Sequence, residues 1–125
     1  MRILPDTHPY LWWLQDHPHL SAEARARILD ATEVYVSSAS IWEAAIKAGL
    51  GKLNADVEEL VREIERCGFC ELQISARHAA AVRSLPSIHN DPLDRLLIAQ
   101  AISEPLRLLT HDSKLKDYSP LVEIV

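Results

Sequence analysis

Long apolar runs are missing from this chain of 125 residues, although 48% of its residues are hydrophobic. A membrane-spanning helix needs about 20 consecutive apolar residues. The first six residues, Met1–Asp6, turn polar at once, which is unlike a secretory signal. We therefore expect a cytoplasmic protein with neither a membrane span nor a signal peptide, folded as one domain over residues 1–125.

An excess of positive charge is also missing. Thirteen lysines and arginines stand against 18 aspartates and glutamates, which gives a net charge of -5. This balance disfavours a nonspecific nucleic-acid-binding protein that works through a basic face. A nuclease stays open, because two divalent cations held by clustered acids would leave the loaded protein at about -1.

Cysteine is scarce, with only Cys67 and Cys70 in a C-x-x-C spacing. This spacing occurs in redox pairs and in halves of zinc sites, but the chain has no other cysteine to complete a zinc site. The helical run 57–66 precedes the pair, and the negative end of a helix disfavours a thiolate. We favour a helix C-cap at Gly68 that leads into a strand.

Strand-like and helix-like segments alternate along the chain. The strand-like segments are 2–4, 33–37, 71–74, 107–110 and 122–125. Helical periodicity or capping marks 10–14, 21–29, 41–47, 56–66, 76–84 and 91–103, with Ser38 or Ser40 as the cap of the third. The alternation predicts a three-layer α/β/α sandwich around a mainly parallel sheet of four to five strands.

Five acids occupy strand ends or helix starts. Asp6 and Asp112 each follow a strand, Asp91 and Asp94 begin a helix, and Glu43 lies early in a helix that follows a strand. These positions meet at the carboxyl edge of an α/β sheet, where such folds bind ligands. Because Mg²⁺ and Mn²⁺ prefer oxygen ligands, the pattern predicts a divalent metal site.

The same charged residues also have ordinary structural interpretations. Asp6 and Asp91 can be helix N-caps, and Glu43 can pair with Lys47 four residues later on a helix surface. Lys47 and Arg95 can contact phosphate or simply be exposed charges. Each segment alone leaves the choice open.

Trp12 and Trp13 are neighbours in a predicted helix. They point about 100° apart and cannot both face the same core surface. Either one of them faces a partner or both are partly buried within the chain.

Four motifs resemble, in order and spacing, those of PIN-domain proteins of the VapC toxin type. They are Ile3–His8, Val36–Glu43, His89–Ala101 and Leu109–Asp112. The resemblance implies a PIN-like fold and a Mg²⁺- or Mn²⁺-dependent endoribonuclease that hydrolyses RNA phosphodiester bonds. It also implies the toxin of a type II toxin–antitoxin pair, a cognate VapB-type antitoxin and a homodimer.

The resemblance also assigns roles to residues. It implies catalytic and metal-binding roles for Asp6, Glu43, Asp94 and Asp112, and supporting roles for Asp91, Thr7 and Thr110. The two threonine hydroxyls stand beside the acids, where they can hydrogen-bond a carboxylate. Two residues depart from the pattern: Pro5 removes a backbone donor and can shift Asp6, and His111 replaces an expected arginine or asparagine.

Two alternatives belong to other functional classes. A receiver-like phosphoacceptor domain has a similar size, but it normally carries adjacent acids after its first strand, and here the run is Asp6-Thr7-His8. A catalytically weak interaction module would bind a partner helix through Trp12 or Trp13.

Overall fold

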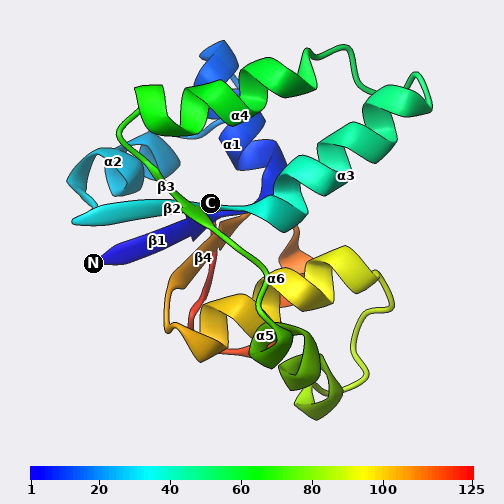
Figure 1. Cartoon of the computed structure of the whole chain (residues 1–125). Coiled ribbons are helices and arrows are strands. Elements are labelled where there is room, and N and C mark those ends of the chain that lie inside the picture. Colours follow the sequence, from blue (N-terminus) through cyan, green and yellow to red (C-terminus); the bar gives the residue numbers. More distant parts are fainter.

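The computed structural model describes residues 1–125 and contains one five-stranded sheet flanked by helices (Figure 1). The strands are β1 (Arg2–Pro5), β2 (Glu33–Ser37), β3 (Cys70–Leu72), β4 (Arg107–Thr110) and β5 (Val122–Ile124). The helices are α1 (Thr7–Gln15), α2 (Ala22–Asp30), α3 (Ser38–Gly49), α4 (Val57–Arg66), α5 (Ala76–Ala81) and α6 (Pro92–Ser103), with the 3₁₀ helices η1 (Val82–Ser84) and η2 (Ser113–Tyr118). The predicted α/β architecture is confirmed, and none of these helices has the length and apolar character needed to cross a membrane.

The sheet is parallel throughout, with the strand order β3-β2-β1-β4-β5. From β1 the chain builds outward through β2 to β3, then crosses back to place β4 on the free side of β1. The order therefore reverses between β1 and β4, which is where open α/β sheets bind ligands. Receiver domains have the order 2-1-3-4-5, so the receiver-like alternative is wrong.

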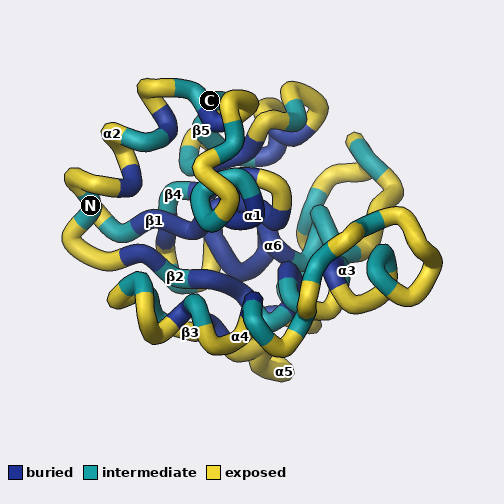
Figure 2. The backbone as a smooth tube through the Cα atoms, turned by 90° about the horizontal axis from the view of Figure 1, so that it is seen from above, coloured by how far each residue is buried: buried dark blue, intermediate teal, exposed yellow.

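Helices cover both faces of the sheet. Helices α1, α2 and α4 lie on one side, and α5 and α6 lie on the other (Figure 1). Side chains of successive β1 residues pack against opposite helix layers. Ile3 packs in one cluster with Ile28 of α2, and Leu4 packs in another with Leu97 of α6. The central strands are consequently buried on both faces (Figure 2).

Helix α3 begins at Ser38, earlier than the predicted run 41–47. The side chain of Ser37 caps it by accepting a hydrogen bond from Ala39 N at 3.0 Å, so neither Ser38 nor Ser40 is the cap. Strand β2 ends at Ser37 and α3 starts at Ser38, because the last strand residue is also the cap. This direct junction points the first turns of α3 at the carboxyl edge of the sheet.

The cysteine pair lies between a helix end and a strand, as predicted, but the C-cap of α4 is Cys67 and not Gly68. Gly68 follows the cap with a positive φ of 76°, which suits glycine. The Phe69 amide then donates to the Ile64 carbonyl at 2.9 Å and closes the helix end. Both thiols are free, and burial raises the pKa of Cys67, which opposes thiolate formation.

Pro5 leaves Asp6 in place. The Asp6 amide donates to the Leu109 carbonyl of β4 at 2.8 Å. Successive strand amides point to opposite neighbours, so the donor that Pro5 lacks would face β2, and β1 pairs with β2 only at Arg2 and Ile3. The proline therefore ends one ladder without disturbing the other.

A buried polar network ties α6 to the sheet. Gln100 is fully buried; its Oε1 accepts from Ser37 Oγ at 2.6 Å and its Nε2 donates to the Gln73 carbonyl at 3.4 Å. The Nδ1 of His78, also buried, accepts from Ser75 N, which leaves Nε2 to donate to Glu104 at 2.6 Å. These bonds fix the rotation of α6 and therefore the direction of its first turn.

We expect Gln100→Ala to lower the free energy of unfolding by about 2–5 kcal/mol, because it leaves a cavity and removes the acceptor of the Ser37 hydroxyl. Urea unfolding measures the loss. Gln15→Ala, the same change at an exposed position in α1, should stay within about 0.5 kcal/mol of the parent. Equal effects of the two changes would contradict the role given to the network.

Candidate metal centre

A cleft of about 400 Å³ opens at the carboxyl ends of β1 and β4. Its walls come from α1, α3, α6 and the turn after β4. All five acids from the sequence analysis line it: Asp6, Glu43, Asp91, Asp94 and Asp112. The five acids therefore lie together at the carboxyl edge of the sheet, as predicted.

Asp6 is at once a helix cap and a member of the acid cluster. It lies between β1 and α1, and its Oδ1 accepts from Thr7 N at 2.7 Å. Its Oδ2 accepts from the Thr110 hydroxyl of β4 at 2.8 Å. With the Asp6 backbone also bonded to β4, the carboxylate is held from both strands that flank the switch point.

Glu43 is likewise both the partner of Lys47 in an ion pair and a member of the acid cluster. Its Oε2 accepts from Lys47 Nζ at 2.7 Å, so the predicted pair four residues apart is present. The Glu43 side chain is only 15% exposed, however, and its Oε1 accepts from the Thr7 hydroxyl at 2.7 Å. The pair therefore lies in the cleft wall and is not a purely solvated surface contact.

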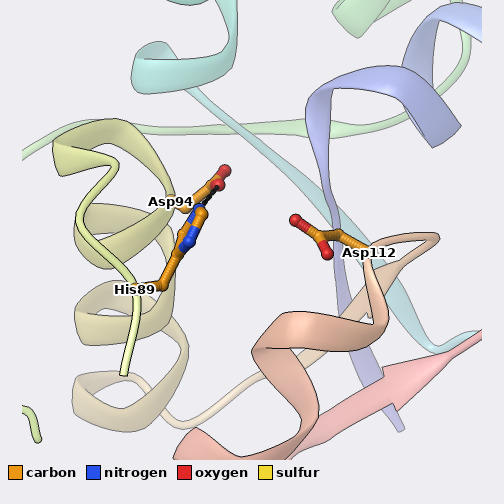
Figure 3. A group of neighbouring side chains, drawn as sticks. All are labelled: His89, Asp94 and Asp112. Atoms are coloured by element: carbon orange, nitrogen blue, oxygen red, sulfur yellow. Dashed lines mark hydrogen bonds and ion pairs between the residues drawn. The ribbon is translucent and has the colours of Figure 1, made fainter. Parts of the chain in front are cut away.

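Asp94 connects two overlapping groups of potential metal ligands. One contains Asp6, Glu43 and Asp94; the other contains His89, Asp94 and Asp112. Within each group the ligand atoms all lie within 4.8 Å of one another. Figure 3 shows His89 beside Asp94, with Asp112 directing its carboxylate toward them from the opposite wall.

Asp91 stands apart from both groups. It caps α6, with its Oδ1 accepting from Leu93 N at 2.9 Å and from Asp94 N at 3.3 Å. Asp91 is exposed. Its cap role orients the first turn of α6, which carries Asp94.

The threonines form hydroxyl bridges between the acids. Thr7 links Asp6 to Glu43, because its amide binds the first carboxylate and its hydroxyl binds the second. Thr110 links Asp6 to the backbone of Asp112, whose amide donates to the Thr110 hydroxyl at 3.1 Å. Both threonines are buried, so the bridges are shielded from water.

His89 is a residue to which the sequence analysis gives no role. Its Nε2 lies 3.0 Å from Asp94 Oδ2. Its backbone is clamped by Tyr118, whose hydroxyl accepts from His89 N at 2.7 Å and lies 3.1 Å from the His89 carbonyl. The spacing of five residues between His89 and Asp94 does not predict their contact, because it depends on the tertiary contact of His89 with Tyr118.

Arg95 belongs to the same clamp. Its guanidinium donates to the carbonyls of Pro86 at 2.8 Å and Val82 at 3.2 Å, and to the Tyr118 hydroxyl at 3.2 Å. Arg95 is half-buried and its guanidinium holds the loop before α6. It is therefore not the free exposed charge that was one of the two sequence-based interpretations.

Crowding and burial make two of the carboxylates harder to ionise. The pKa of Asp6 is raised, chiefly by burial, although the bonds from Thr110 and Thr7 oppose the shift. Burial, followed by the negative charges of Asp6 and Asp91, raises the pKa of Asp94 from its ordinary value of 3.8 to about 6, against the contact with His89. A cation at this place would relieve both effects.

The donor set fits a hard divalent cation. It consists of carboxylate oxygens and one imidazole nitrogen, and the cysteines do not line the cleft. Oxygen-rich sets suit Mg²⁺ and Mn²⁺, whereas thiolates suit softer metals. The arrangement can hold a divalent ion.

Comparison with known proteins agrees with this geometry. A sequence model of the PIN domain matches residues 3–120. Ribonuclease VapC22 from Mycobacterium tuberculosis is 30% identical in an alignment that covers 93% of this chain and 91% of that protein.

Solved structures share the fold. VapBC2 from Rickettsia felis, crystallised with a promoter DNA fragment, has a TM-score of 0.69 at 17% identity, covering 100% of this chain and 98% of that one. A toxin–antitoxin complex from Klebsiella pneumoniae has a TM-score of 0.63 at 18% identity, with 98% and 95% covered.

The raised pKa of Asp94 predicts a pH effect on the metal-free protein. A carboxyl whose pKa is higher in the folded protein than in the unfolded chain favours the folded state at low pH. This contribution to stability is lost as the pH rises from about 4 through about 6. Asp94→Asn keeps the uncharged form at every pH. In EDTA the variant should therefore become more stable than the parent by up to about 3 kcal/mol between pH 4 and pH 8.

Urea unfolding of both proteins at several pH values measures this difference, in which the titration of groups distant from Asp94 cancels. Asp30→Asn, at an exposed position in α2, is the matched control and should show no such pH-dependent gain. A parent-to-variant difference that is the same at pH 4 and pH 8 would refute the assignment.

Proposed function

Because this chain belongs to the PIN-domain family of VapC-type ribonucleases, we propose that it is a divalent-metal-dependent endoribonuclease and the toxin of a toxin–antitoxin pair. The observation that supports this most is the meeting of Asp6, Glu43 and Asp94 at the β1/β4 switch point. These residues come from three separate segments, and the negative charges of Asp6 and Glu43 both oppose ionisation of Asp94, so the grouping suits a bound cation.

We assign metal binding to Asp6, Glu43, Asp94 and Asp112, with Mg²⁺ or Mn²⁺ as the ion. A divalent ion held by these residues would supply water activation and stabilise negative charge on the phosphate oxygens during hydrolysis of an RNA phosphodiester. Asp6 and Asp94 supply the central carboxylates, because Asp6 is fixed by two strands and Asp94 belongs to both ligand groups. Glu43 and Asp112 complete the two sides.

The remaining polar residues orient these carboxylates. Thr7 and Thr110 each hold one oxygen of Asp6 or Glu43, which leaves the other lone pairs directed into the cleft. Lys47 neutralises part of the Glu43 charge and lines the same cleft. Such outer contacts set ligand geometry and influence metal affinity.

The proposed partners are an RNA substrate, a cognate VapB-type antitoxin and a second copy of the chain. Support for the antitoxin comes from the family and from the toxin–antitoxin assemblies that share this fold.

Asp94→Asn should lower the rate of RNA cleavage by at least about 100-fold, because the change removes a charged ligand shared by both groups. Cleavage of end-labelled single-stranded RNA with Mg²⁺ or Mn²⁺ measures the rate, and EDTA should abolish it. Asp30→Asn should cleave like the parent. Parental cleavage by Asp94→Asn would refute the site, whereas a parent that cleaves no RNA would favour the interaction module.

Thr110 allows a second test of the proposed geometry. Thr110→Val keeps the side-chain shape but removes the hydroxyl that holds Asp6, so metal affinity should fall about 10- to 100-fold. Thr110→Ser keeps the hydroxyl and should remain close to the parent in affinity. Calorimetric titration with Mn²⁺ compares them, and equal affinities for valine and serine would rule out the bridging role.

A further inference from the structure

Four of the six histidines of the chain surround one tryptophan at the edge of the cleft. The ring centroids of His8, His17, His19 and His111 lie 5.7, 6.0, 5.5 and 5.4 Å from that of Trp12. We call these five residues the aromatic collar. The proposed chemistry uses none of them.

The collar has no packing role that would explain it. Trp12 is half-buried, and His8, His19 and His111 are exposed, so a hydrophobic core does not require their rings. The neighbouring Trp13, by contrast, packs inward against Phe69. Both tryptophans are half-buried within the chain, which is the second of the two predicted outcomes, with Trp13 directed toward the core and Trp12 toward the cleft.

The collar also lacks the geometry of a metal site. None of its histidines belongs to a group of three ligand atoms within 4.8 Å. His17 Nδ1 already accepts a hydrogen bond from His19 N at 3.0 Å, and His111 Nδ1 lies 3.1 Å from the Val125 carbonyl. Those nitrogens are engaged with the backbone and not directed toward a common point.

The collar is continuous with the acid cluster. Trp12, His8 and His111 line the same cleft as the carboxylates. His8 and Trp12 are four residues apart and share one side of α1, whose N-cap is Asp6. Six residues of helix place Trp12 about 9 Å along the axis from that acid. His111 directly precedes Asp112 and joins the collar to the opposite wall.

We propose that the collar is a subsite for an unpaired RNA base next to the phosphate that is cleaved, with Trp12 as its stacking residue. This inference rests on the proposed ribonuclease function. Proteins bind single-stranded RNA by stacking exposed bases on tryptophan and histidine rings. A chain whose net charge is -5 has little basic surface for RNA, so stacking supplies attraction that phosphate contacts do not.

The test is a double-mutant cycle between protein and RNA. Trp12→Leu removes the aromatic face but keeps an apolar side chain, and Trp12→Phe restores a ring. Trp42→Leu, on α3 and outside the cleft, is the matched control. The RNA partner is a single-stranded oligoribonucleotide in which one base at a time, on either side of the mapped cleavage position, is replaced by an abasic site.

Trp12→Leu should raise KM, and the Kd measured by fluorescence anisotropy with Ca²⁺ in place of Mg²⁺, by about 5- to 150-fold. Its kcat should change less than about threefold, because the substitution does not touch the carboxylates. Trp12→Phe should recover most of the affinity, and Trp42→Leu should match the parent. On RNA that is abasic at the contacted position, the difference between parent and Trp12→Leu should disappear.

Parental KM and Kd in Trp12→Leu would overturn the proposal, as would an effect that persists unchanged on every abasic RNA. Equal weakening by Trp42→Leu would overturn it too, since it would indicate a general loss of structure or of assembly. If the parent cleaves RNA while the cycle shows no coupling, the subsite alone fails. If the parent cleaves no RNA, the ribonuclease proposal fails, and the anisotropy measurements still decide whether Trp12 contacts a base.

Discussion

The pairing of β1 with β4 is the constraint on which the cleft depends. Register places Pro5 opposite Leu109, so Asp6 emerges beside Thr110 and their side chains bond at 2.8 Å across 104 residues of sequence. Because the order of the sheet reverses here, no crossover helix covers the gap between the strand ends. The same pairing that completes the core therefore leaves the acids open to a ligand.

Holding these acids together works against folding, and the surroundings limit the cost. Burial raises the pKa values of Asp6 and Asp94, which means that the fold resists charging them. Hydrogen bonds from Thr7 and Thr110 to Asp6, and the contact of His89 with Asp94, offset part of that resistance. Fully buried neighbours such as Leu4 keep the strand ends rigid, so the carboxylates cannot relax apart. The acid cluster therefore lowers the stability of the metal-free protein, and a bound cation would offset this effect.

The strands and helices could be predicted from the sequence, because they follow from local periodicity. The convergence of the acids could be predicted as well, because parallel strands end at one edge of the sheet. The sequence was insufficient where a side chain meets a distant partner. The spacing of Glu43 and Lys47 predicts their ion pair but not that it faces the cleft, since nothing local tells which side of α3 meets α1. Arg95 and His89 depend on Tyr118, more than 20 residues away, and were misassigned or missed for that reason.

The two ligand groups differ in what holds them, and this difference bears on how the cleft works. Asp6 and Glu43 are fixed to the sheet and to α3 through Thr7, so their geometry follows from the core itself. His89 and Asp112 lie on a loop and at the start of η2, and their link is Tyr118, which bonds the His89 backbone from the end of that 3₁₀ helix. Arg95 of α6 donates to the same Tyr118 hydroxyl, so this second group is tied to the helix that carries Asp94. The two groups thus depend on different parts of the fold, and Asp94 is the residue that they share.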